Sequence, residues 1–167
     1  MQSVQTLMSD SVFELPNGSF LLIPYSIASM LHQYRQLEPT SKEQGGMLMG
    51  VARAEQNQNF TIKYPPCIEV LSITEPCKSD QATRISFKRR CNHHMIDIEK
   101  ALSIHASLVY LGEWHTHPQD TPKPSNIDLQ SWQNAFKNKM AIVAIVGRVN
   151  DWWGYWSGNK ILPIKRV

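Results

Sequence analysis

Two histidines and an aspartate stand at a spacing that could hold a metal ion. His115 and His117 follow the apolar segment 107–114, and Asp128 comes further along the chain. Side chains two positions apart on a strand point to the same face, so both imidazoles can converge on one ion. Two imidazoles and a carboxylate leave a fourth tetrahedral position for water, which is the pattern of catalytic zinc. The histidine pair alone would not indicate a site, because one buried and one exposed histidine explain it equally well.

The aspartate reaches the histidines only if a helix begins between them. Ser125 follows a proline and is a typical helix N-cap, and apolar residues recur at helical spacing over 125–137. Asp128 then falls in the first turn of this helix, which a strand–loop–helix return can bring over the strand end. The loop 118–124 contains three prolines, which restrict its conformations and help to hold Asp128 in place.

Hydrolysis at such a metal also needs a general base. Water bound to zinc ionises near pH ~7 rather than roughly 15.7, but its proton must still reach the leaving group. Glu43 is the best candidate because it opens the predicted strand 43–53 and is followed by glycines that allow close backbone approach. Taken alone, Glu43 could equally be an ordinary surface carboxylate.

The composition is that of one globular domain, which we expect to span residues 1–167. Hydrophobic residues make up 42% of the 167 residues and charged residues 19%, so a metal is not needed to hold the fold together. The net charge of +3 is too small to indicate nucleic-acid binding. We expect no signal peptide, because residues 1–18 lack a basic segment followed by an apolar core, and no apolar run approaches the roughly 18–20 residues that cross a membrane. We therefore expect a soluble cytoplasmic protein.

Cysteine usage gives a separate expectation. Cys67, Cys77 and Cys91 are odd in number and form no CxxC pair, which argues against a disulfide framework and against a cysteine-ligated zinc. We expect reduced structural thiols.

Strand and helix patterns alternate along the chain and predict an α/β fold, with a mixed sheet flanked by helices. Strands are expected at 20–23, 43–53, 60–64, 67–74, 84–87, 107–114, 141–149, 152–156 and 161–164. Helices are expected from Pro24 to near Glu38, over 92–106 and over 125–137, with a turn at 56–59 and a polar loop at 75–82.

The chemical residues together resemble a known motif. Glu43-x-x-Gly46-x-x-x-Gly50, followed by His115-x-His117-Pro118, Ser125 and Asp128, is similar to the JAMM motif of MPN-domain zinc metallopeptidases. The resemblance implies a single MPN domain with a curved mixed β-sheet. It also implies that His115, His117 and Asp128 bind Zn²⁺, that Glu43 is the base, and that Ser125 donates a hydrogen bond to the oxyanion.

Further segments resemble a narrower bacterial group. The stretches 73–89, 112–118 and 124–132 are similar to JAMM proteins of integrative and conjugative elements and to deconjugating peptidases of CBASS anti-phage operons. The resemblance implies removal of a conjugated protein, cut after the C-terminal tail of a cGAS-like nucleotidyltransferase or a ubiquitin-like protein. The alternatives are a deubiquitinase-like peptidase of another bacterial system, a non-catalytic MPN scaffold and a hydrolase or deaminase of small molecules. The absence of a cysteine ligand pair disfavours a nucleobase deaminase.

Four other features have open interpretations. Glu113 could support a metal ligand or be a structural carboxylate, while Trp114 should point into the core. The aromatic run 152–156 should pack on both faces of a strand, with a peptide groove as the alternative. His93, His94 and His105 are expected to be ordinary surface or helix residues. The loop 75–84 is predicted to hold a substrate tail by strand addition.

Overall fold

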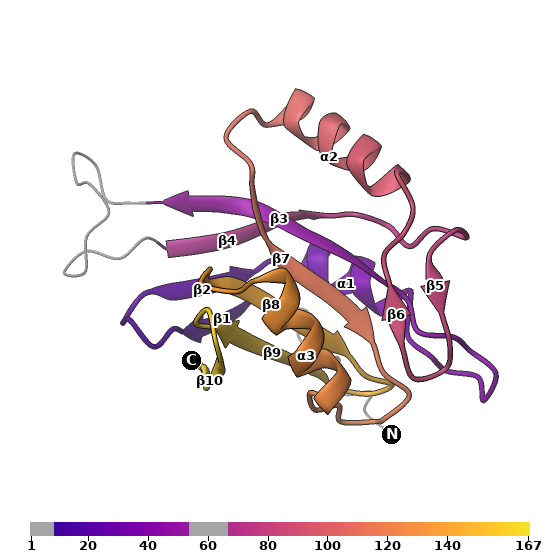
Figure 1. Ribbon diagram of the computed structural model, residues 1–167. Helices are drawn as coiled ribbons and strands as arrows, with labels where there is room; N and C mark the ends of the chain where they lie inside the picture. Colours follow the sequence, from indigo (N-terminus) through magenta and orange to yellow (C-terminus); the bar gives the residue numbers. More distant parts are fainter. Residues whose placement is uncertain (1–8, 54–66) are drawn as a thin grey trace, which may run out of the picture.

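A single large sheet forms the frame of the protein (Figure 1). The computed structural model describes residues 9–53 and 67–167. Its helices are α1 (Tyr25–His32), α2 (His93–Ile104) and α3 (Asn126–Ala135). Its strands are β1 (Ser11–Glu14), β2 (Phe20–Ile23), β3 (Gly45–Arg53), β4 (Cys67–Ile73), β5 (Gln81–Ala82), β6 (Phe87–Lys88), β7 (Val109–Thr116), β8 (Ala141–Val146), β9 (Asp151–Trp156), β10 (Ile161–Leu162) and β11 (Lys165–Arg166).

The main sheet is mixed and curled, as the resemblance to MPN domains implies. Its strand order is β10-β9-β8-β7-β3-β4-β2-β1-β11, with β7–β8 and β2–β4 parallel and the other neighbours antiparallel. β5 and β6 form a separate two-stranded hairpin. The central strands β3, β7 and β8 bring Gly45 directly opposite His115, so the segment that contains Glu43 ends beside the histidines.

The helices cover both faces of the sheet. α1 contributes Ile27 and Leu31 to the largest core cluster, which also contains Trp114. On the opposite face, α3 packs through Trp132 against β8 and β9. α2 packs on the same face through Ile98, against β3 (Figure 1). Trp114 therefore lies in the core, as predicted, while its neighbour His115 faces α3.

The aromatic run on β9 packs on both faces of the strand, as predicted. Trp156 and Trp152 belong to the cluster under α3, whereas Tyr155 and Trp153 belong to the α1 cluster. Trp152 also stacks on Trp132, with ring centroids 6.0 Å apart.

The main differences from the predicted elements lie where the chain makes tertiary contacts. α1 ends at His32 rather than near Glu38, because Gln36 is turned inward to hydrogen-bond Ser41 and Arg84. The segment expected as a loop and a strand at 84–87 instead forms the β5–β6 hairpin, with residues 83–86 in its turn. β1 and β11 were not predicted. The predicted turn at 56–59 and strand at 60–64 lie outside the described residues.

The expectation of reduced thiols is wrong for two of the three cysteines. Cys77 and Cys91 form a disulfide, with their Cα atoms 6.1 Å apart, while Cys67 is free. The two cysteines flank the β5–β6 hairpin, and the return of the chain through this hairpin brings them together. Counting and spacing of cysteines cannot reveal a pair that tertiary structure creates.

None of the helices in the described part of the chain combines the length and hydropathy needed to cross a bilayer.

Candidate metal centre

The side chains of His115, His117 and Asp128 converge at the end of β7. Their ligand atoms all lie within 4.8 Å of one another, and all three residues are buried. The Nε2 atoms of His115 and His117 are 3.0 and 3.3 Å from the two carboxylate oxygens of Asp128. The two Nε2 atoms are themselves 3.1 Å apart.

This donor set fits a zinc ion. Ligands about 2.0–2.1 Å from a tetrahedral zinc lie roughly 3.3 Å from one another, close to the observed separations. When both imidazoles are neutral and turned to bind a metal, each Nε2 carries a lone pair. Two such lone pairs side by side repel each other unless a cation lies between them and the carboxylate. The chemistry of the donors therefore matches the metal that the sequence predicts.

The start of α3 holds Asp128 in place through a capping box. The Ser125 hydroxyl accepts a hydrogen bond from the Asp128 backbone N–H at 3.2 Å, and Asp128 Oδ2 accepts one from the Ser125 N–H at 2.6 Å. Burial alone raises the pKa of the Asp128 carboxyl. When the two histidines donate to it in the absence of a metal, hydrogen bonds from His115 and His117, the charge of His115 and the Ser125 N–H outweigh burial, so the pKa of Asp128 lies below its ordinary value. Asp128 is thus ionised and ready to bind a cation.

Glu43 lies beside the cluster with its carboxyl group buried. Its Oε1 is 3.8 Å from Nε2 of His117, and its side chain is 3% exposed. Burial, and then the negative charge of Asp128, raise the pKa of Glu43 to about 8. A bound cation favours the ionised form and opposes this shift. A buried carboxyl group beside the cluster is placed to accept and release a proton.

Glycine at two positions lets β3 approach the site. A Cβ on Gly45 would lie 2.7 Å from the Phe87 ring and from the Trp114 carbonyl oxygen. A Cβ on Gly46 would lie 2.3 Å from the Thr74 carbonyl oxygen. A side chain at Gly45 would press on the backbone of β7, and one at Gly46 would press on the backbone that follows β4, so either would displace the start of β3.

Ser125 is compatible with both of its predicted roles. Its oxygen accepts the hydrogen bond that caps α3, which leaves the hydroxyl proton available for donation. The residue is partly buried at the edge of the cluster.

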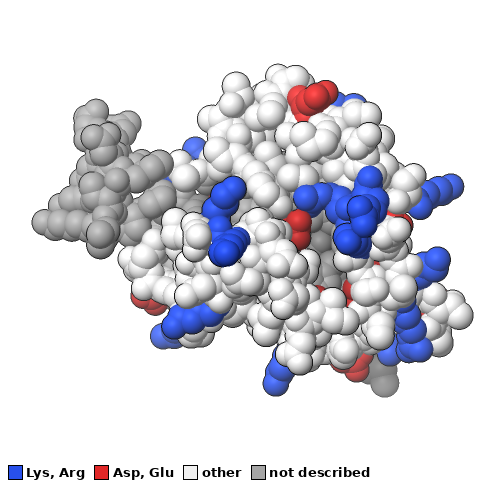
Figure 2. Space-filling view, in the orientation of Figure 1, with Lys and Arg blue, Asp and Glu red and all other residues white. Residues whose placement is uncertain are grey.

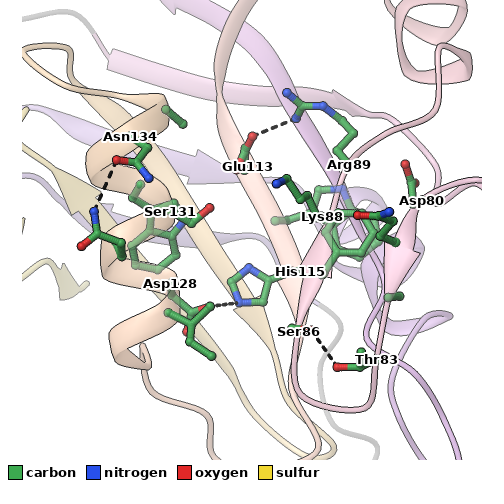
Figure 3. A pocket seen from close by; sticks show the side chains of 18 of the residues that line it. Asp80, Thr83, Ser86, Lys88, Arg89, Glu113, His115, Asp128, Ser131 and Asn134 are labelled. Atoms are coloured by element: carbon green, nitrogen blue, oxygen red, sulfur yellow. Dashed lines mark hydrogen bonds and ion pairs between the residues drawn. The ribbon is translucent and has the colours of Figure 1, made fainter.

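A groove of about 1270 Å³ opens above the cluster, between α3 and the β5–β6 hairpin. In Figure 3, His115 and Asp128 lie at one end of the groove, Ser131 and Asn134 line its α3 side, and Lys88 lines its hairpin side. Lys and Arg side chains gather beside this hollow in Figure 2. The groove is large enough for an extended peptide segment to reach the ligands.

Glu113 lines the groove without contacting the ligands. It accepts hydrogen bonds from Arg89 at 2.8 Å and from the Tyr110 hydroxyl at 3.3 Å. These contacts favour the structural interpretation of this carboxylate.

His94 lies in a helix, α2, which is one of the two expected placements, but it is buried and makes specific contacts. Its side chain is 1% exposed, with Nε2 2.8 Å from Asp80 Oδ2 and Nδ1 2.7 Å from the Thr74 hydroxyl. Asp80 also accepts hydrogen bonds from the backbone N–H groups of Cys77, Arg90 and Cys91. The histidine thereby fixes the base of the hairpin on α2, a role that local sequence spacing could not indicate.

Comparison with known proteins identifies the family. The chain belongs to the prokaryotic homologs of the JAB domain, whose family model matches residues 27–155. The predicted likeness to JAMM/MPN proteins is confirmed, whereas a single domain over 1–167 stays a prediction.

The chain is similar to curated relatives named CD-NTase/cGAS isopeptidase. It is 32% identical to one from Escherichia coli (strain TW11681), over 95% of this chain and 96% of the relative. It is 32% identical to one from Vibrio cholerae, over 96% and 99%. It is 27% identical to one from Pseudomonas aeruginosa, over 79% and 80%.

Proposed function

We propose that this chain is a zinc-dependent isopeptidase that releases a conjugated protein from its target. The observation that carries the proposal is the convergence of His115, His117 and Asp128 beside the buried Glu43, with His115 and Asp128 lining an open groove. A binding scaffold has no need of three converging ligands with a buried carboxyl group beside them. The names of the relatives support the same activity.

His115, His117 and Asp128 would hold the zinc ion. When bound, zinc would polarise the scissile carbonyl and lower the pKa of an attacking water to about 7. Glu43 accepts the proton of that water and delivers it to the nitrogen of the leaving amine. Ser125 donates its free hydroxyl proton as a hydrogen bond to the oxyanion. The hydroxyl of water ends on the carbonyl carbon and its proton on the amine, so the C–N bond is hydrolysed.

The substrate would be a protein conjugate whose C-terminal tail lies in the groove. The named activity of the relatives supports the tail of a cGAS-like nucleotidyltransferase, joined to a target in bacterial anti-phage defence. The β5–β6 hairpin forms one wall of the groove and could receive an extended tail by strand addition. A ubiquitin-like conjugate is the alternative with the same chemistry.

The proposal is tested with a purified conjugate between a cGAS-like nucleotidyltransferase and a lysine-containing target. We expect the wild-type protein to release the nucleotidyltransferase with an intact C-terminus, and a chelator to stop the reaction until zinc is restored. Glu43→Gln should retain zinc and lose cleavage, whereas the exposed Glu99→Gln should behave as wild type. Full cleavage by Glu43→Gln would contradict the assigned base. Cleavage of a ubiquitin-like conjugate alone would assign the alternative substrate.

A further inference from the structure

A buried glutamine lies behind the metal centre, at the meeting point of three segments of the chain. Gln36 follows α1 and is 2% exposed. Its Nε2 donates hydrogen bonds to the carbonyl oxygens of Ser41 and Arg84, both at 3.0 Å. Its Oε1 accepts a hydrogen bond from the Thr116 hydroxyl at 2.9 Å. Two carbonyls around the nitrogen and a hydroxyl at the oxygen fix the orientation of the amide.

The third of these partners stands between the two histidine ligands. Thr116 is fully buried, and on a strand its side chain points to the opposite face from His115 and His117. Its hydroxyl oxygen accepts a hydrogen bond from the Gln44 N–H at 2.9 Å, and its own N–H donates to the Gln44 carbonyl at 2.8 Å. The residue after Glu43 is therefore tied twice to the strand that carries the ligands.

The hairpin holds Glu43 from its other side. The Glu43 N–H donates to the carbonyl oxygen of Thr83 at 2.8 Å, and Gln36 holds the carbonyl of the next hairpin residue, Arg84. Gln36 thus bonds directly to the turn of the hairpin and, through Thr116, to Gln44. One side chain joins the groove wall, the segment that contains Glu43 and the ligand strand.

We propose that Gln36 is a positioning residue that fixes Glu43 relative to His115 and His117. The inference rests on the proposed role of Glu43 as the base. A base must lie within about 2.6–3.2 Å of the group whose proton it takes, and a misplacement of about 1 Å can cost ~10²-fold in rate. The same amide also holds the hairpin turn. Gln36 therefore fixes the position of Glu43 relative to the groove wall that would receive the substrate tail.

The test compares Gln36→Met, which keeps the length of the side chain without its hydrogen bonds, with Thr116→Val, which removes only the hydroxyl. We expect both variants to lower kcat about 10- to 100-fold with the zinc-to-protein ratio unchanged. Thr116→Val, which leaves the bond from Gln36 to the hairpin in place, should also keep the wild-type KM. Thr116→Ser, which keeps the hydroxyl, should restore most of kcat. Gln33→Met, an exposed change nearby on the same segment, is the matched control. Wild-type kcat in both Gln36→Met and Thr116→Val would overturn the inference.

A second comparison separates positioning from general damage to the structure. We compare the residual cleavage rate of Glu43→Gln with that of the double variant Glu43→Gln/Gln36→Met. The two rates should be equal, because Gln36 acts through the position of Glu43. An equal fold-loss in both backgrounds, or a loss of zinc that matches the loss of kcat, would overturn the inference. Full activity of Glu43→Gln itself would instead refute the proposed function. An inactive Glu43→Gln with a fully active Gln36→Met would refute only the role of Gln36.

Discussion

The two walls of the groove are held by different kinds of interaction. On one side, His115 lies near the end of the central strand β7, and Asp128 lies in the first turn of α3, which packs through Trp132 on a buried apolar cluster. On the other side, β5 and β6 are two-residue strands. This wall is held at its base by the Cys77–Cys91 disulfide and by Asp80, and at its turn by hydrogen bonds to Glu43 and Gln36.

This difference separates chemistry from substrate contact. We call the side formed by β7 and α3 the ligand wall, after the proposed ligands His115 and Asp128, and the side formed by β5 and β6 the hairpin wall. The ligand wall is placed by regular elements and by core packing, which tolerate little movement. The hairpin wall has few apolar contacts of its own and depends on a small number of cross-links. Changes on the ligand wall should therefore abolish the reaction, whereas changes on the hairpin wall should act on stability and on substrate binding.

The largest expected effect follows from Asp128→Asn on the ligand wall. The amide oxygen can still accept the capping hydrogen bond from Ser125, but the negative charge between the two histidines is lost. We expect zinc affinity to fall and the rate of conjugate cleavage to drop at least about 10³-fold. Zinc titration and cleavage assays measure both. The control is Asp120→Asn, at an exposed carboxylate of the neighbouring loop, which should change neither zinc affinity nor the cleavage rate. Unchanged zinc affinity in Asp128→Asn would show that Asp128 is not a ligand.

The next effect tests the base of the hairpin through Asp80→Ala. Three backbone N–H groups and the buried His94 would lose their acceptor, which should lower the free energy of unfolding by about 3–5 kcal/mol. Chemical denaturation measures this loss. Bound zinc should survive, because Asp80 is not among the converging ligands. A loss below about 1 kcal/mol would show that the hairpin base does not depend on this carboxylate.

The same carboxylate predicts a pH dependence. Burial raises the pKa of Asp80, but hydrogen bonds from Arg90, Cys91, His94 and Cys77 outweigh it, so the pKa in the folded protein is lowered. A lowered pKa means that the contribution of Asp80 to stability is present above the ordinary aspartate value, about 3.9, and is lost as the pH falls through the lowered value. The stability difference between wild type and Asp80→Ala should therefore shrink in acid. A difference that stays constant would contradict the role of the ionised form.

A smaller loss of stability is expected from opening the disulfide. Closing a loop of about 15 residues stabilises a protein by roughly 3 kcal/mol, through the unfolded chain. Cys77→Ser combined with Cys91→Ser should therefore lower the melting temperature by about 6–12 °C. Reductant should lower the melting temperature of the wild type and leave that of the double variant unchanged. Cys67→Ser, at the free thiol, is the control. If reductant does not change the melting temperature of the wild type, the disulfide does not hold the hairpin.

The sequence predicted the ligand wall well because its signals are local. The strand before His115, the capping serine and the aspartate in the first turn all lie within one segment, and each depends on near neighbours. The hairpin wall was missed because its stability comes from partners far along the chain. Asp80 binds His94 of α2, Thr83 binds Glu43, and Gln36 binds Arg84. The pattern of apolar and polar residues in 75–91 cannot predict these contacts.

The smallest effect should come from Lys88→Ala on the hairpin wall. Lys88 is exposed on β6 and lines the groove opposite the uncharged side chains of Ser131 and Asn134. Removing it should leave the zinc content and kcat unchanged and raise KM several-fold, because a tail docked on β6 would lose contact with the stem and charge of the lysine. Deleting part of the hairpin would be a poorer test, since the deletion would also remove the Thr83 carbonyl that holds Glu43. Lys100→Ala, exposed on α2, is the matched control. If KM stays unchanged in Lys88→Ala, the tail does not lie along the hairpin wall at Lys88. Substrate binding would then not distinguish the hairpin wall from the ligand wall.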